Sequence, residues 1–166
     1  MVLSTEVSSK GSLPIQIEPM RVRDLDAVLA IERTSFPTPW SRYAYLSELL
    51  ENDRAYYIVA RTSDRKVAGY TGMWLILDEG HITTIAVHPL YRGRGVGRQL
   101  LEAAEAIARE RGALRITLEV RVSNIIAQSL YEKTGYVNVG IRPGYYRDNN
   151  EDAIIMWKEL YLEEGF

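Results

Sequence analysis

Cysteine is absent from this 166-residue chain. Its absence excludes disulfides, thiolate metal sites and a cysteine nucleophile. Only two histidines are present, His81 and His88, and neither has the carboxylate spacing of a metal site, so we expect no metal. We interpret His81 as an ordinary strand residue and His88 as part of a turn before Pro89.

Long apolar runs and charge of one sign are missing too. The longest strongly apolar stretch, Met73 to Leu77, is far shorter than the roughly 20 residues that cross a bilayer. The N-terminus lacks the basic start and apolar run of a signal peptide, so we expect a cytoplasmic protein. Twenty basic and 22 acidic side chains leave a net charge of −2, which predicts neither a nucleic-acid partner nor a membrane partner.

What is present indicates one globular domain. Hydrophobic residues make up 46% of the chain and charged residues 25%, a composition typical of a soluble globular protein. Serines with Gly11 predict a flexible leader over residues 1–13. We expect a single domain over residues 14–160 and a short tail over residues 161–166. The composition leaves the oligomeric state open.

The first half of the domain combines two helices with a meander. Asp24 is a candidate cap for a first helix, and a second is predicted from Ser41 to Leu50. Stretches rich in β-branched and aromatic residues, separated by turn residues, then predict antiparallel strands. They cover residues 15–18, 56–61, 66–77 and 81–87.

The second half changes period twice. Apolar residues recur on one helical face from Val96 to Ala108, and the helix is expected to end before Gly112. Residues 114–121 then alternate apolar and polar, which predicts a strand with Glu119 on the face away from the core. A further helix over 124–134 and strands over 136–141 and 153–157 complete a mixed α/β (α+β) fold.

The sharpest local motif is Arg92-Gly93-Arg94-Gly95-Val96-Gly97, between a strand and the long helix. Glycines allow close approach to a phosphate, and helix-terminal N–H groups favour an anion. Arg92, Arg94 and Arg98 add positive charge. The motif lacks the Walker A ending and the dinucleotide-binding spacing. From these residues alone, an anion site and a glycine-rich turn on a basic surface both remain open.

Four motifs in order resemble the GNAT acetyltransferase superfamily, and within it the RimI type, the ribosomal-protein-alanine N-acetyltransferases. The resemblance spans about residues 15–158. It implies a central, mostly antiparallel twisted sheet of six to seven strands flanked by about four helices. The motifs are Arg92-x-x-Gly95-x-Gly97, Leu118 to Asn124, Leu130 to Tyr136, and Tyr145-Tyr146 followed by Glu151 to Met156.

The resemblance implies acetyl-CoA as cosubstrate and assigns residues to it. Glu119 is the implied general base and Tyr131 the implied general acid. The residues implied to bind the cofactor are Ile85, Ala86, Val87, Arg92, Gly93, Arg94, Gly95, Val96, Gly97, Arg98, Asn124 and Tyr131.

The residues alone leave other roles open at three of these positions. Glu119 could be a surface carboxylate paired with Arg115 or Arg121. Tyr131 could be a core aromatic, and Asn124 a simple helix cap. Helical spacing places Asn124, Gln128 and Tyr131 on one face, where they could meet the same ligand.

The acceptor implied by the resemblance is a protein N-terminus, most specifically a ribosomal protein with an N-terminal alanine. Trp40, Tyr145 and Tyr146 are the predicted walls of its site, and the acidic residues Asp148, Glu151 and Asp152 could attract a basic tail. Three alternatives stay open: broad specificity for protein N-termini, acetylation of a small amine or lysine, and a non-catalytic CoA-binding partner module.

Overall fold

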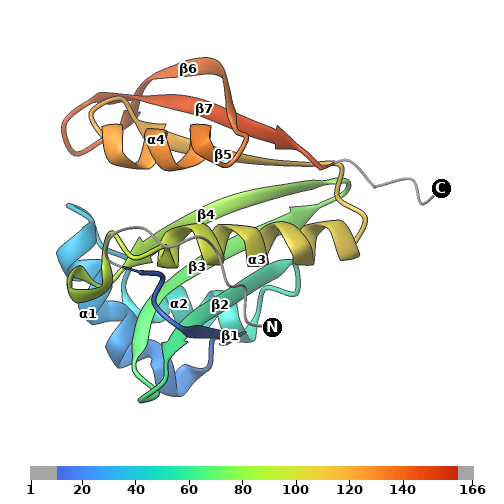
Figure 1. The fold of residues 1–166 in the computed structure, drawn as a ribbon. Coiled ribbons are helices and arrows are strands. Elements are labelled where there is room, and N and C mark those ends of the chain that lie inside the picture. Colours follow the sequence, from blue (N-terminus) through green and yellow to red (C-terminus); the bar gives the residue numbers. More distant parts are fainter. Residues whose placement is uncertain (1–10, 161–166) are drawn as a thin grey trace.

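The computed structural model describes residues 11–160, so most of the predicted leader and all of the predicted tail lie outside the described residues. Within that range a seven-stranded sheet carries four α-helices (Figure 1), which confirms the predicted fold class. The elements in chain order are β1 (Ile15–Pro19), the 3₁₀ turn η1 (Val22–Asp24), α1 (Leu25–Ser35), α2 (Arg42–Leu50), β2 (Ala55–Thr62), β3 (Val67–Ile76), β4 (Glu79–Val87), η2 (Pro89–Tyr91), α3 (Val96–Glu110), β5 (Arg115–Arg121), α4 (Ile125–Lys133), β6 (Val137–Tyr146) and β7 (Glu151–Glu159).

The sheet runs in the order β1-β2-β3-β4-β5-β7-β6, and all neighbours are antiparallel except β4 and β5. These two parallel strands pair only from Glu79 with Arg115 to His81 with Thr117. Beyond His81 they separate, and the register with β3 skips Thr83 as a bulge. Bulges bend a strand and increase its twist. The second half of β4 is therefore paired on one side only.

Helices cover both faces of the sheet (Figure 1). Successive residues of β2 point to opposite faces: Tyr57 and Val59 pack with α1 and α2, whereas Ile58 and Ala60 pack with α3. This follows from the two-residue period of a strand. A further core between α3, α4, β5 and β7 holds the sheet's second half together. Residues of β4 and β5 belong to these cores, which hold the two strands in place where they separate.

The helix starts explain where the chain turns. The Ser41 hydroxyl accepts from Ala44 N at 3.1 Å and caps α2, which begins one residue after the predicted start, and α3 ends two residues before Gly112. Asp24 stands at the N-cap position of α1 as predicted, but its side chain makes no capping bond. Its carboxylate accepts from Arg21 N at 2.8 Å and from Arg61 at 2.7 Å instead. Within residues 11–160, no helix is both long and apolar enough to span a membrane.

Candidate active site

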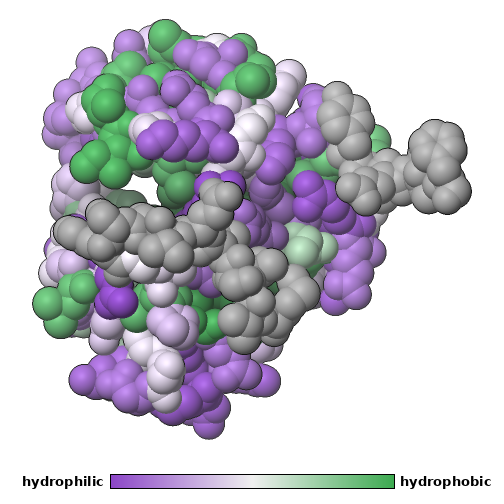
Figure 2. Space-filling model, viewed as in Figure 1, coloured by the Kyte–Doolittle hydropathy of each residue, from purple (hydrophilic) through white to green (hydrophobic). Residues whose placement is uncertain are grey.

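Two cavities occupy the wedge between β4 and β5, and the space-filling view is hollowed there (Figure 2). The first, of about 580 Å³, is lined by Glu32, Glu119 and Arg121 among others, and we call it the carboxylate cavity. The second, of about 640 Å³, borders the glycine motif, and we call it the glycine-loop cavity. The two share a set of lining residues and are therefore adjacent: Ser35, Phe36, Ile85, Asn124, Ala127 and Tyr131.

The glycine-loop cavity gathers nearly all the residues that were predicted to bind a cofactor. Arg94 is the exception among them, since it is not part of the lining and its carbonyl accepts from Leu13 N at 3.1 Å. The structure brings together at this cavity Ile85, Ala86, Val87, Arg92, Gly93, Gly95, Val96, Gly97, Arg98, Asn124 and Tyr131.

The start of α3 presents backbone donors to this cavity. Gly95 adopts a left-handed conformation with φ of 79°, which favours glycine, and it turns the chain directly into the helix. The first N–H groups of a helix lack intrahelical acceptors, and the helix dipole adds positive potential. Gly97 keeps α4 close, since a Cβ there would lie 3.3 Å from the Leu130 side chain. The arrangement suits an anionic ligand.

The arginines of the motif are partly engaged within the protein. Arg92 donates from Nε to the Val87 carbonyl at 2.9 Å and from its guanidinium to the Ser35 hydroxyl at 3.2 Å. Arg98 pairs with Glu102 at 3.1 Å, one turn along α3. Arg92 therefore ties the loop to the end of β4 and to α1.

Glu119 lies on β5 in the carboxylate cavity, and its side chain is 11% exposed. Its Oε2 is 2.6 Å from Nε2 of His81, and its Oε1 lies 3.9 Å from Arg142. Burial raises the pKa of Glu119. The hydrogen bond and charge of His81 and the charge of Arg142 lower it by more than burial raises it, so the pKa is below its ordinary value. Glu119 is thus a carboxylate at neutral pH.

The environment of Glu119 corrects two interpretations from the sequence. Its partners are not Arg115 or Arg121, which pair with Glu159 and with the β6–β7 turn. His81 is a strand residue as predicted, but it is not isolated, because the parallel pairing of β4 with β5 places it beside Glu119. His88 does lie in the predicted turn, where Nδ1 accepts from Leu90 N at 3.1 Å.

Tyr131 lines both cavities and so lies at their junction. Its ring packs 5.9 Å from that of Tyr136, and no hydrogen bond to its hydroxyl occurs among residues 11–160. Burial raises the pKa of the Tyr131 phenol, and the nearby Tyr146 raises it further. The phenol is therefore protonated at neutral pH and can donate its proton.

The N-terminal turn of α4 completes the junction. Asn124 caps the helix by accepting from Ala127 N at 3.1 Å and also lines both cavities. Gln128 does not share this position, contrary to the sequence prediction. Its amide donates to the carbonyls of Arg121 and Val122, both at 2.9 Å, and holds the turn between β5 and α4.

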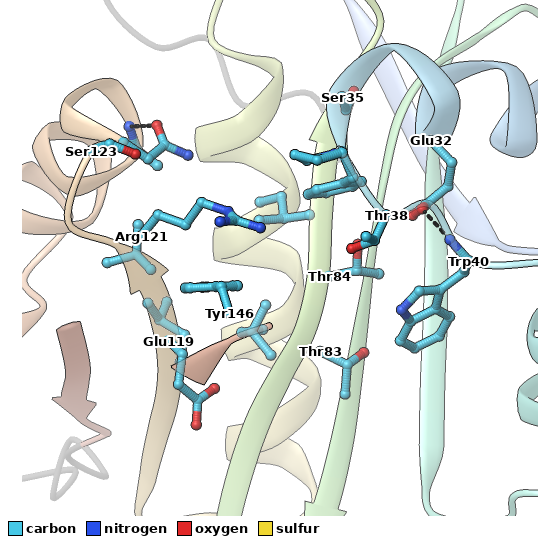
Figure 3. A pocket seen from close by; sticks show the side chains of 18 of the residues that line it. Glu32, Ser35, Thr38, Trp40, Thr83, Thr84, Glu119, Arg121, Ser123 and Tyr146 are labelled. Carbon is cyan, nitrogen blue, oxygen red and sulfur yellow. Dashed lines mark hydrogen bonds between the residues drawn. The ribbon is translucent and has the colours of Figure 1, made fainter. Parts of the chain in front are cut away.

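Aromatic residues form part of the wall of the carboxylate cavity (Figure 3). Trp40 and Tyr146 line it, whereas Tyr145 is not in the lining and stacks edge-on to Tyr146 with ring centroids 5.0 Å apart. The guanidinium of Arg121 lies 3.9 Å from the centre of the Tyr146 ring. Arg121 therefore holds Tyr146 against the cavity.

The acidic residues of the β6–β7 turn have internal partners. Arg121 pairs with Asp148 at 3.1 Å and with Glu151 at 3.2 Å, and Asp152 accepts from Gly144 N at 2.8 Å. The prediction that these carboxylates attract a basic tail is not supported by this arrangement, because their charge is used to shape the hairpin.

Sequence comparison defines the class of protein with this fold and site. Residues 25–136 match the acetyltransferase (GNAT) family. The chain belongs to this family and is an N-acetyltransferase, an acyltransferase that uses acetyl-CoA, as the resemblance predicted.

Individual relatives are more specific. The chain is 48% identical over 138 residues to a Bacillus subtilis (strain 168) protein named as a candidate ribosomal protein bS18-alanine N-acetyltransferase, covering 83% of this chain and 91% of the relative. It is 37% identical over 142 residues to the Escherichia coli (strain K12) ribosomal protein bS18-alanine N-acetyltransferase, covering 84% and 94%. The crystal structure of an E. coli ribosomal-protein-S18-alanine N-acetyltransferase superposes with a TM-score of 0.80, covering 92% of this chain and 99% of that one.

Proposed function

We propose that this chain transfers the acetyl group of acetyl-CoA to the α-amine of the N-terminal alanine of ribosomal protein bS18. The observation that carries the proposal is the pair of joined cavities, one with an anion-binding loop and one with a carboxylate, in a chain similar over nearly their whole length to proteins named for this reaction.

The glycine-loop cavity fits acetyl-CoA. The amides of Val96, Gly97 and Arg98 are placed to bind the pyrophosphate, as expected at a helix N-terminus. The unpaired side of β4, including Ile85 and Val87, offers backbone groups to the amides of the pantetheine arm. When bound, acetyl-CoA supplies the thioester.

Glu119 and Tyr131 divide the proton chemistry between them. An α-ammonium has a reference pKa near 8, so it is mostly protonated at neutral pH and must lose a proton before it attacks. Glu119 accepts that proton, directly or through a water, with His81 supporting the carboxylate at 2.6 Å. The amine nitrogen bonds to the acetyl carbon as the C–S bond breaks, and the nitrogen loses its second proton to solvent, which in turn restores the proton that Tyr131 gives up. Tyr131 then donates its phenolic proton to the sulfur.

The transfer is direct, within one ternary complex. Cysteine is absent from the chain, so an acetyl-cysteine intermediate is excluded. The shared wall of the cavities allows amine and thioester to meet beside Tyr131, and Trp40 and Tyr146 on the other side contact the first residues of the acceptor.

The test is acetyl transfer from acetyl-CoA to a peptide with the N-terminal sequence of bS18 beginning with alanine. Controls are the same peptide with its N-terminus formylated, peptides with other first residues, free lysine and a polyamine. Mass spectrometry should locate one acetyl group on the α-amine of the alanyl peptide and none on the formylated peptide. Transfer only to lysine or the polyamine would contradict the proposed acceptor, while transfer to every first residue would contradict the specificity.

A further inference from the structure

The carboxylate of Glu32 is buried in α1 yet lines the carboxylate cavity, and its residue is 1% exposed. Its Oε1 accepts hydrogen bonds from the hydroxyls of Tyr45 at 2.6 Å and Tyr70 at 2.7 Å. Its Oε2 accepts from Trp40 N at 2.9 Å. Three donors around one carboxyl group suit the carboxylate form, which only accepts hydrogen bonds.

Glu32 has no cationic partner in the part of the chain that the structure describes. None of the ion pairs within residues 11–160 includes it, although a buried glutamate is almost always paired. Its two tyrosine partners stay protonated, because burial and the neighbouring charges raise the pKa of each phenol above its ordinary value. The negative charge is therefore stabilised by hydrogen bonds but not neutralised.

The rest of the cavity does not neutralise this charge. The charged lining residues are Glu32, Glu119 and Arg121, and Figure 3 shows Glu32 beside Trp40 on one side and Glu119 near Arg121 on the other. Arg121 is already paired with two acidic residues, Asp148 and Glu151, and Glu119 has His81 and Arg142 beside it. Glu32 is the carboxylate of the lining that lacks an ionic partner.

We propose that Glu32 is a specificity-determining residue. Its buried, unpaired carboxylate favours an acceptor that enters the cavity as a cation, the α-ammonium of a peptide, over a peptide whose N-terminus is neutral. It acts through space and not by accepting the proton. Because the Glu32 carboxylate is itself buried, its charge is less screened than that of a surface group, so its effect extends beyond hydrogen-bond distance. This inference rests on the proposed function, because it concerns an amine acceptor.

The experiment compares two peptides that differ only in the α-amino group that carries this charge. One begins with alanine, and the other carries a propionyl group in place of alanine, with the same carbon skeleton but no amine. Calorimetry measures both dissociation constants on the CoA-loaded full-length protein at pH 6.5, where the α-amine is almost entirely protonated. Acetyl transfer by the unmodified protein to the alanyl peptide, measured on the same preparation, tests the proposed function separately.

Two variants show which carboxylate, Glu32 or Glu119, causes a preference for the alanyl peptide. Glu32→Gln keeps the shape, since the amide oxygen can accept from Trp40 N while the amide N–H groups face the hydroxyls of Tyr45 and Tyr70. Its preference for the alanyl peptide should fall about tenfold relative to the unmodified protein. Glu119→Gln should retain a preference of several-fold, because Glu32 remains.

Glu48→Gln is the matched control, because Glu48 accepts from Trp74 Nε1 at 2.8 Å but does not line the cavity. Its preference should be unchanged. The inference is overturned if Glu32→Gln keeps the original preference for the alanyl peptide, or if it weakens the binding of both peptides equally. It is also overturned if Glu48→Gln lowers the preference as much as Glu32→Gln does. Should Glu32→Gln fail to fold, loss of all preference in Glu119→Gln would overturn the inference by itself.

Discussion

Replacement of Glu119 by glutamine tests the proposed base most directly. The substitution keeps the size of the side chain and one oxygen near His81, but it removes the group that accepts the proton. Glu119 lines the carboxylate cavity and not the glycine-loop cavity, so the perturbation is confined to the acceptor side. We expect kcat/KM to fall while the dissociation constant of acetyl-CoA changes less than twofold.

The size of the loss follows from what remains at the site. General-base catalysis contributes about 10²- to 10⁴-fold, equivalent to about 3 to 5 kcal/mol of transition-state stabilisation. About one tenth of the α-amine is already free at pH 7, so part of the rate survives without the base. We therefore expect a loss of about 10²-fold for Glu119→Gln at pH 7.

The assay is the initial rate of acetyl transfer to the alanyl peptide between pH 6 and pH 9.5. Because the pKa of Glu119 is below its ordinary value, the unmodified enzyme keeps its base ionised throughout this range. The variant depends on free amine, so its rate should rise with pH up to about 8, the reference pKa of the α-amine. Glu159→Gln, at the surface pair with Arg115, is the control. An unchanged kcat/KM at pH 7 would refute the assignment of Glu119.

Three other changes probe the acid, the hairpin and the acid stability of the fold. Tyr131→Phe should lower kcat about 10²-fold with little change in acetyl-CoA affinity, and a large loss of affinity with normal kcat in single-turnover and binding assays would assign it to the cofactor pocket instead. Arg121→Gln should raise KM for the peptide about tenfold because Tyr146 loses its anchor, and an unchanged KM would show that the hairpin needs no such support. Arg65 and Arg61 lower the pKa of Glu18 from 4.5 to about 2, so its stabilising contribution is present above pH 4.5 and is lost as pH falls towards 2. Acid unfolding of Glu18→Gln should accordingly show a weaker pH dependence in that window, and a curve parallel to that of the unmodified protein would contradict this.

Much of the fold and part of the site could be predicted from local patterns. Alternation over residues 115–121 placed Glu119 on the face opposite Leu118 and Val120, which are buried as expected. Glycine spacing before the apolar helical stripe located the loop at the start of α3. Such signals are local, since they depend on the period of one element and on one turn.

What could not be predicted depends on contacts between distant segments. His81 meets Glu119 across 38 residues of sequence, through a parallel pairing that no local pattern encodes. Glu32 left a signal that was overlooked, because it follows Val28 by four residues and so shares its buried helical face. A charged residue on such a face calls for a partner, and here the partners came from α2 and β3.

The separation of β4 from β5 creates a sheet edge inside the molecule. Exposed edges are usually sites where other strands add and proteins aggregate. Here the edge faces a cavity bounded by the end of α1 and by α3 and α4, which shields it from other chains but admits an extended ligand. A ligand with its own amide groups would complete the sheet as an added strand does. Binding is thereby linked to folding, so saturating ligand at 100 times its dissociation constant should stabilise the protein by about 2.7 kcal/mol.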